Sequence, residues 1–87
     1  MSTCKILFFA SLKELAGERQ ITLEVPNVIS VGELRSMLQD KFPSLKPAMD
    51  HAFIAVNREY SKDEVIIPPE AEIAIFPPVS GGISFRY

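Results

Sequence analysis

The sequence predicts an α+β domain in which one main helix packs on one face of a mixed sheet of four or five strands. Strand-like segments lie on both sides of one long helical segment, so strands and helix can form two packed layers. The chain has 87 residues, which is enough for one hydrophobic core but too short for two. We therefore expect a single domain.

The first part of the chain is predicted to form two strands with a short helix between them. Residues 4–10 (CKILFFA) are rich in Ile and Phe, as strands often are. Residues 11–17 (SLKELAG) begin with a serine that could cap a helix of two turns and end with a glycine at the C-cap position. Residues 20–25 (QITLEV) alternate polar and apolar side chains, which predicts a strand paired antiparallel with the first.

The main helix is predicted to begin after Ser30 and to end before Pro43. Ser30 and Glu33 have the spacing of a capping box, in which each side chain bonds the other residue's backbone N–H. Pro43 disfavours a helical conformation in the residue before it. The apolar residues keep helical spacing and would face the sheet; they are Val31, Leu34, Leu38 and Phe42, with Met37 beside them.

The remaining segments are predicted to complete the sheet. Residues 43–50 form a turn-rich connection to a third strand at 52–57 (AFIAVN). A short edge strand at 65–67 (VII) and a last strand at 72–76 (EIAIF) follow. The ubiquitin-like β-grasp is the common fold of this order and size, although order alone does not single it out.

Composition excludes several classes of function. With 9 basic and 11 acidic residues, the net charge of −2 gives no reason to bind nucleic acid or an anionic membrane. The single cysteine and single histidine cannot form an internal disulfide or a metal cluster. We interpret Cys4 as a small buried hydrophobe and His51 as a solvated surface residue. Without a long apolar run or a signal pattern, a cytoplasmic location is expected.

The sequence contains no nucleophile–base motif, no carboxylate pair and no phosphate-binding loop. Attention therefore turns to the C-terminal segment, whose composition is unusual. Residues 77–87 read PPVSGGISFRY. Two prolines stiffen an extended arm. Gly81 and Gly82 have no side chains, so this stretch could enter a narrow channel in a partner. A bare Gly-Gly pair would be compatible with an ordinary flexible loop.

The string PPVSGG at residues 77–82 resembles the C-terminal signature of the molybdopterin synthase small subunits, a family of ubiquitin-like sulfur carriers. The resemblance covers about residues 4–82, which is nearly the whole chain. Further segments resemble the family in the right order, namely LFFASLKELAG at 7–17, FPSL at 42–45, AVNREY at 55–60 and EIAIFPP at 72–78.

The resemblance implies a carrier whose reactive group is the chain end at Gly82. In the family, an E1-like enzyme adenylates this carboxylate with ATP, and a sulfur donor converts the acyl-adenylate into a thiocarboxylate. The tail then inserts into the large subunit of molybdopterin synthase and delivers sulfur to cyclic pyranopterin monophosphate. The small subunit itself would be non-catalytic, without metal or cofactor, in a heterotetramer of two small and two large subunits. The residues that would thread into the partner are Pro77, Pro78, Val79, Ser80 and Gly81.

The resemblance also implies a docking surface near the tail, at Phe9, Tyr60 and Phe76. Strand alternation independently places Phe9 and Phe76 on the sheet face opposite the core. Exposed aromatic residues gathered on one face are typical of an interface. The alternative is that these rings cover a second small cluster within the monomer.

Two departures from the family pattern matter. Residues 70–71 (EA) stand where family members often carry Gly-Asp, which alters a turn. More seriously, residues 83–87 (ISFRY) follow Gly82, whose carbonyl is then an amide that cannot be adenylated. We favour removal of 83–87 by a protease, leaving a carrier domain of residues 1–82. The alternatives are a non-carrier paralogue that keeps its tail for binding and a tail of cloning origin.

Two further expectations concern the pathway and the tail. Among carriers, the alternatives serve thiamine synthesis or tRNA thiolation, which share the fold and the terminal Gly-Gly. In the tail, Ile83, Phe85 and Tyr87 alternate with polar residues. An uncleaved tail is therefore expected to be strand-like and able to add to a sheet edge.

Overall fold

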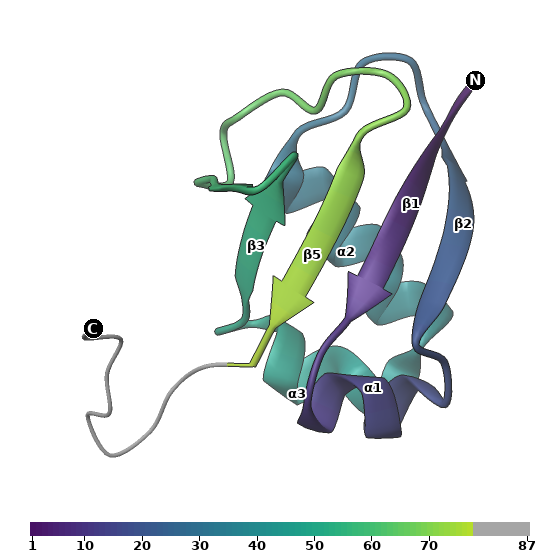
Figure 1. Ribbon diagram of the computed structural model, residues 1–87, viewed down its shortest axis with the longest axis vertical. Coiled ribbons are helices and arrows are strands. Elements are labelled where there is room, and N and C mark those ends of the chain that lie inside the picture. Colours follow the sequence, from purple (N-terminus) through teal and green to yellow (C-terminus); the bar gives the residue numbers. More distant parts are fainter. Residues whose placement is uncertain (78–87) are drawn as a thin grey trace.

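The computed structural model describes residues 1–77, which form a five-stranded mixed sheet with helices on one face (Figure 1). The strand order is β2-β1-β5-β3-β4, and the predicted α+β layout with one main helix is confirmed. The elements are β1 (Ser2–Phe8), α1 (Ser11–Ala16), β2 (Gln20–Val25), α2 (Val31–Lys41), the 3-10 helix η1 (Pro43–Leu45), α3 (Lys46–Met49), β3 (Phe53–Val56), β4 (Glu59–Tyr60) and β5 (Glu72–Phe76).

The strand from the N-terminus and the last strand, β1 and β5, lie side by side in the middle of the sheet and run parallel (Figure 1). β2 pairs antiparallel with β1, as the sequence predicts, and β3 pairs antiparallel with β5. The register brings Ile6 opposite Ile73 and Ile54 opposite Ile75, so the apolar positions of three strands share one face. A slip by one residue would turn every one of these side chains to the other face.

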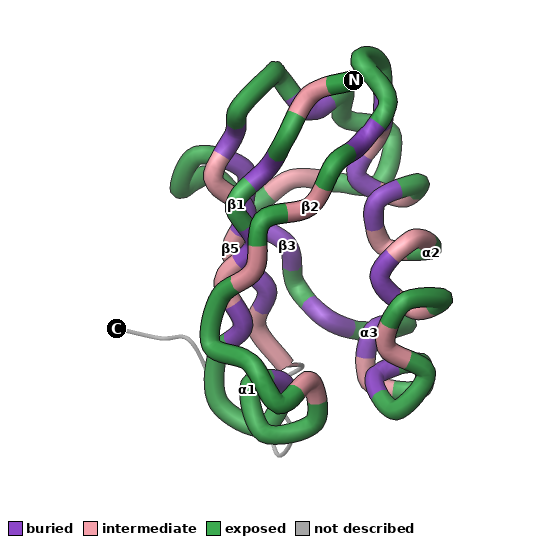
Figure 2. The backbone as a smooth tube through the Cα atoms, turned by 90° about the vertical axis from the view of Figure 1, so that its right-hand side faces the viewer, coloured by how far each residue is buried: buried purple, intermediate pink, exposed green. Residues whose placement is uncertain are grey.

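The core lies between this sheet face and α2 (Figure 2). Each fully buried aliphatic or aromatic side chain stabilises the fold by about 1.5–3 kcal/mol relative to leaving it in water. Cys4 is buried among them, as predicted. The buried side chains of this interface include Ile6, Phe8, Ile54, Ile73 and Ile75 from the sheet and Val31, Leu34 and Leu38 from α2.

The capping box of α2 is confirmed at both of its hydrogen bonds. The backbone N–H of Glu33 donates to Ser30 Oγ at 3.1 Å, and the N–H of Ser30 donates to Glu33 Oε1 at 2.9 Å. The helix ends at Lys41, just before Pro43. The connection that follows is more ordered than predicted, because Pro43 begins η1 and α3 continues directly from it.

The start of α1 differs from the prediction. Ser11 is the first helical residue and does not cap the helix, since β1 ends at Phe8 instead of residue 10. Ala10 occupies the N-cap with φ 54° and ψ −130°, a conformation that an L-residue adopts only under strain. Gly17 is the C-cap in the left-handed conformation, as predicted.

The predicted edge strand at 65–67 is wrong, and β4 takes that place in the described sheet. Residues 65–67 pair instead with the chain leading into α2, where Ile66 forms an isolated bridge with Ser30. The edge is β4 because Asn57 and Arg58 both have positive φ values, 48° and 74°. Positive φ at both central residues is the requirement of a type I′ hairpin turn, which folds β4 back along β3.

Candidate docking surface and arm

Four aromatic rings gather on the sheet face opposite α2, where β5 ends. Phe9 and Phe76 stack with ring centroids 4.7 Å apart. Tyr60 meets Phe76 at 6.0 Å and Phe53 at 6.2 Å, in both cases edge to face. We call Phe9, Phe53, Tyr60 and Phe76 the aromatic cluster. The structure thus brings together the three residues predicted for docking; their role in binding remains a prediction.

The cluster surrounds a hollow because small side chains lie between the rings. Ala55 and Ala74 are cross-strand partners, and Leu7 is the partner of Ala74 on the other side. The short side chains of the two alanines leave a depression of about 430 Å³. Its lining consists of Leu7, Phe9, Ala55, Arg58, Tyr60, Glu72, Ala74 and Phe76. The hollow is therefore mainly apolar, with one acidic and one basic residue in its lining.

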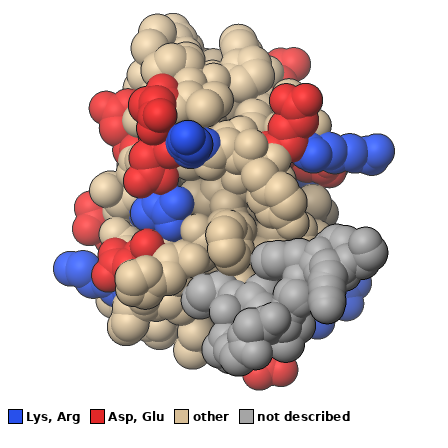
Figure 3. Space-filling model, turned by 90° about the vertical axis from the view of Figure 1, so that its left-hand side faces the viewer, with Lys and Arg blue, Asp and Glu red and all other residues tan. Residues whose placement is uncertain are grey.

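The rings of the cluster are exposed to a degree that is unusual for large apolar side chains. Phe9 is 40% exposed, Phe53 42% and Tyr60 68%, while Phe76 is half-buried. Figure 3 views the molecule from the side of β3 and shows uncharged surface toward the lower middle, with acidic and basic side chains above it and to its left. The rings do form a cluster within the monomer, yet they remain open to solvent, which is typical of an interface.

Phe53 belongs to the aromatic cluster, although the sequence-based interpretation did not include it. Strand alternation in the sequence could have identified Phe53. Ile54 and Val56 are buried, so Phe53 and Ala55 turn to the opposite face. Phe53 lies directly opposite Phe76 across the β3–β5 pair. It widens the cluster toward the sheet edge.

The arm leaves the sheet from within the cluster. Phe76 ends β5, and Pro77 is the next and last described residue, half-buried. The other residues predicted to thread into a partner, 78–81, the reactive Gly82 and the extension 83–87 lie outside the described residues. β5 is held on both sides by β1 and β3, so the base of the arm is firmly placed.

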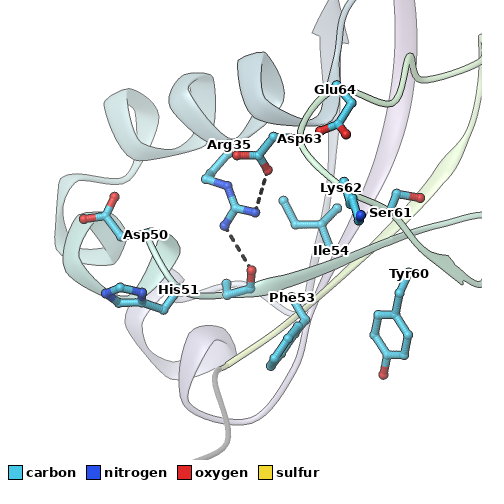
Figure 4. Close-up of a pocket in the computed structure, with 11 residues that line it drawn as sticks. Arg35, Asp50, His51, Phe53, Ile54, Tyr60, Ser61, Lys62, Asp63 and Glu64 are labelled. Atoms are coloured by element: carbon cyan, nitrogen blue, oxygen red, sulfur yellow. Dashed lines mark hydrogen bonds and ion pairs between the residues drawn. The ribbon is translucent and has the colours of Figure 1, made fainter.

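A second hollow of about 440 Å³ lies near the ends of α3 and β4 (Figure 4). Arg35 from α2 reaches its wall and donates to the carbonyl oxygens of Met49 and Ala52 and, at 2.9 Å, to Asp63 Oδ1. These bonds tie α2 to α3 and to the segment before β5, which makes Arg35 structural. His51 lies in the same wall and is exposed, as predicted.

The described residues offer little chemistry of their own. Within residues 1–77, no group of three or more His, Cys, Asp or Glu side chains could hold a metal ion. The same part of the chain contains no helix that is long and apolar enough to span a membrane. Burial raises the pKa of the Cys4 thiol, which keeps it neutral and suits its place in the core.

Comparison with known proteins assigns the chain to a family. The model of the ThiS family matches residues 6–82, nearly the whole chain. The chain belongs to the ThiS family. Two relatives, each named molybdopterin synthase sulfur carrier subunit, are 38% identical in Arabidopsis thaliana and 41% in Dictyostelium discoideum. The matches cover 90% of this chain in both cases, and 81% and 94% of the respective relatives.

Two solved structures support the fold of this ThiS-family chain. SAMP1 from Haloferax volcanii superposes with a TM-score of 0.79 at 30% identity, covering 92% of this chain and 99% of that one. A complex of subunits 1 and 2 of the molybdopterin-converting factor from Helicobacter pylori gives a TM-score of 0.66 at 26% identity, covering 92% and 99%. The ubiquitin-like β-grasp fold expected from the sequence is confirmed.

Proposed function

We propose that this ThiS-family chain is the sulfur carrier of molybdenum cofactor biosynthesis. After removal of residues 83–87, the carboxyl group of Gly82 would carry sulfur as a thiocarboxylate and donate it to cyclic pyranopterin monophosphate within molybdopterin synthase. One observation carries the proposal: the family match ends at Gly82, where a carrier must end. The names of the relatives support the same pathway.

The chemistry of the proposal needs only a free chain end. A carboxylate at Gly82 is ionised at neutral pH, so one oxygen can attack the α-phosphorus of ATP and release pyrophosphate. A sulfur donor at the oxidation level of sulfide then forms a C–S bond as AMP leaves. An E1-like adenylating enzyme would supply the ATP site and the acid–base groups. Under this proposal the chain itself contributes only the reactive end, and the partner contributes the catalytic groups.

We propose that the aromatic cluster docks on the large subunit of molybdopterin synthase. The Helicobacter pylori complex pairs a structurally similar subunit with a second subunit of the same factor. Docking at the cluster would aim the arm into that partner, because the arm begins at Phe76 and Pro77. We extend the proposal to a heterotetramer of two small and two large subunits, to a processing protease and to a cytoplasmic location.

The intact mass of the protein from its native cells tests the carrier function. We expect a species that ends at Gly82, together with a form heavier by the difference between one sulfur and one oxygen atom. Full-length chain alone, in cells that are making molybdopterin, would overturn the proposal. Sulfur transfer by the 1–82 form to cyclic pyranopterin monophosphate, with purified large subunit, separates this pathway from thiamine synthesis and tRNA thiolation.

A non-carrier binding module makes a different prediction for the same 1–82 form. Such a module would gain no ATP-dependent activation by an E1-like enzyme after truncation. A carrier would become adenylated when incubated with its E1-like enzyme and MgATP, and release of pyrophosphate measures this step. The uncleaved chain is the control, since its Gly82 carbonyl is an amide.

A further inference from the structure

We propose that Arg58 is a specificity-determining residue of the docking surface, whose guanidinium binds a carboxylate of the large subunit. The inference rests on the proposed function, because it names a chemical group on the partner proposed there. It adds a directional contact to a surface that is otherwise mainly apolar. The contact would fix the orientation in which the partner lies on the aromatic cluster.

Arg58 occupies a turn position that favours glycine. It is the second central residue of the type I′ turn between β3 and β4 and has a φ of 74°. The common residue pair for this turn is Asn-Gly, and here the pair is Asn57 and Arg58. Glycine adopts this conformation freely, whereas the Cβ atom of any other L-residue strains it. The fold alone therefore does not account for an arginine, and strain of this kind points to a function.

The turn places Arg58 firmly at the rim of the hollow. The backbone N–H of Asn57 donates to the carbonyl oxygen of Glu72 at 2.8 Å. The backbone N–H of Glu72 donates in return to Asn57 Oδ1 at 2.9 Å. Both bonds tie the turn to the first residue of β5, while Arg58 itself lines the hollow and is exposed. The base of its side chain is thus held in place, and its guanidinium is accessible to a partner.

The charge of Arg58 is not paired within the part of the chain that the structure describes, where its side chain has no hydrogen bond and no ion pair. Two acidic residues lie nearby. Glu59 pairs with the buried Val56, so its side chain turns to the helix side of the sheet. Glu72 shares the lining, but it has a basic neighbour of its own in Lys5, its register partner on β1. The Arg58 guanidinium is therefore available to a group from outside.

Arg58 and the base of the arm lie at opposite ends of the hollow. The register of β3 and β5 brings Phe53 opposite Phe76 at the end where the arm begins, and Ala55 opposite Ala74 in the middle. The turn that carries Arg58 follows at the other end of β3. Apolar packing is non-directional, so the rings alone leave the partner free to pivot on the surface. An ion pair at the far end prevents this pivoting and aims the arm.

A carboxylate is the group on a protein partner that the Arg58 guanidinium would bind most specifically. The planar guanidinium donates two parallel hydrogen bonds to the two oxygens of one carboxylate. Docking would also exclude water from the apolar hollow beside this contact. The pair would then be stronger than an ion pair on an open surface, which solvent screens.

Arg58→Gly tests the proposal through opposite effects on stability and binding. Because glycine relieves the strained turn, we expect a higher urea midpoint. Because the charged hydrogen bonds are lost, we also expect the dissociation constant of the 1–82 form for the purified large subunit to rise about tenfold or more. A residue with a purely structural role would not combine higher stability with weaker binding. Unchanged affinity, measured by isothermal titration calorimetry, would overturn the proposal.

Charge reversal separates a local contact from an effect of net charge. Arg58→Glu is expected to weaken binding more than Arg58→Gly does, and the loss should shrink at high salt, which screens the repulsion. Arg19→Glu is the matched control, because Arg19 is exposed just before β2 and lies outside the lining of the hollow. This control should change the dissociation constant by less than about twofold. Equal losses in the two Glu variants would reject a contact at Arg58.

The wild type and Phe76→Arg separate this inference from the proposed function. If the wild-type 1–82 form binds, Phe76→Arg abolishes binding and Arg58→Gly does not weaken it, docking at the cluster stands and the role of Arg58 fails. If the wild-type 1–82 form does not bind the large subunit, the proposed docking fails and the role of Arg58 fails with it. The intact mass measurement still tests the carrier chemistry in that case.

Discussion

Phe9 and Phe76 stack almost in parallel, with an interplanar angle of 13°, although 66 residues lie between them in the sequence. Phe9 directly follows β1, and Phe76 is the last residue of β5. The cause is the parallel register of β1 and β5, in which Phe8 pairs with Ile75. Phe8 and Ile75 turn into the core, so the residue after each of them turns outward and the two outward rings meet. The pairing of the two central strands therefore creates the centre of the aromatic cluster.

Phe76→Arg is predicted to abolish binding of the 1–82 form to the large subunit while the fold is retained. A guanidinium placed among three rings adds a charge that docking would desolvate, and loss of a central aromatic residue typically costs more than about 2 kcal/mol of binding free energy. Isothermal titration calorimetry measures the affinity, and circular dichroism checks the fold. Thr22→Arg, an exposed change on β2 of the same sheet, is the matched control. Unchanged affinity of the Phe76 variant would contradict docking at the cluster.

Ala10→Gly is predicted to stabilise the protein by about 1 kcal/mol, because glycine adopts φ 54° and ψ −130° without the strain of a Cβ atom. The gain is partly offset by the greater freedom of glycine in the unfolded chain. Urea denaturation measures the change in free energy of unfolding. Ala16→Gly, within α1, is the control and should destabilise by about 0.5–1 kcal/mol. A destabilised Ala10 variant would show that this position is not strained.

Arg35→Met is predicted to destabilise the fold by about 2–3 kcal/mol, because the carbonyl oxygens of Met49 and Ala52 lose their donor in a part-buried place. The ion pair with Asp63 contributes less, since the Asp63 side chain is 59% exposed and solvent screens the pair. Asp63→Asn is accordingly expected to cost less than about 1 kcal/mol. Equal losses in the two variants, measured by urea denaturation, would refute this division.

The Cys4 thiol is predicted to make the fold less stable at alkaline pH. Burial raises its pKa in the folded state, so the unfolded chain releases the proton first as pH rises. Stability is then fully present below the pKa of the unfolded thiol and is lost as pH rises through the pKa of the folded one. Urea midpoints from about pH 7 to about pH 10 should fall more steeply for the wild type than for Cys4→Ala. Parallel curves would contradict the prediction.

Much of the fold could be predicted because its signals are local. The capping box at Ser30 and Glu33 and the proline at 43 define α2, and β5 has the predicted bounds of 72–76. β4 could not be predicted, because two residues show no periodicity and their pairing depends on backbone angles at Asn57 and Arg58. The β-branched run at 65–67 indicated a strand, but those residues find their partners beside α2.

Part of the aromatic cluster could be predicted from the sequence, some residues from strand alternation and one from the family resemblance. Alternation along the strands places Phe9 and Phe76 on the outer face, and the same rule would have found Phe53. Tyr60 was named only through the family resemblance, since its position depends on the hairpin turn that precedes it. The hollow depends on the pairing of Ala55 in β3 with Ala74 in β5. Local sequence patterns do not predict the register between two strands, so the hollow could not be predicted.

The central place of β5 has a mechanical consequence. A partner that grips the arm and later lets it go pulls along β5, which is hydrogen-bonded to β1 on one side and β3 on the other. A pull in this direction loads both rows of backbone hydrogen bonds in shear, so many must break together before the strand can slide. The fold is thus expected to resist unfolding from the C-terminal strand when the tail is repeatedly inserted into a partner and withdrawn.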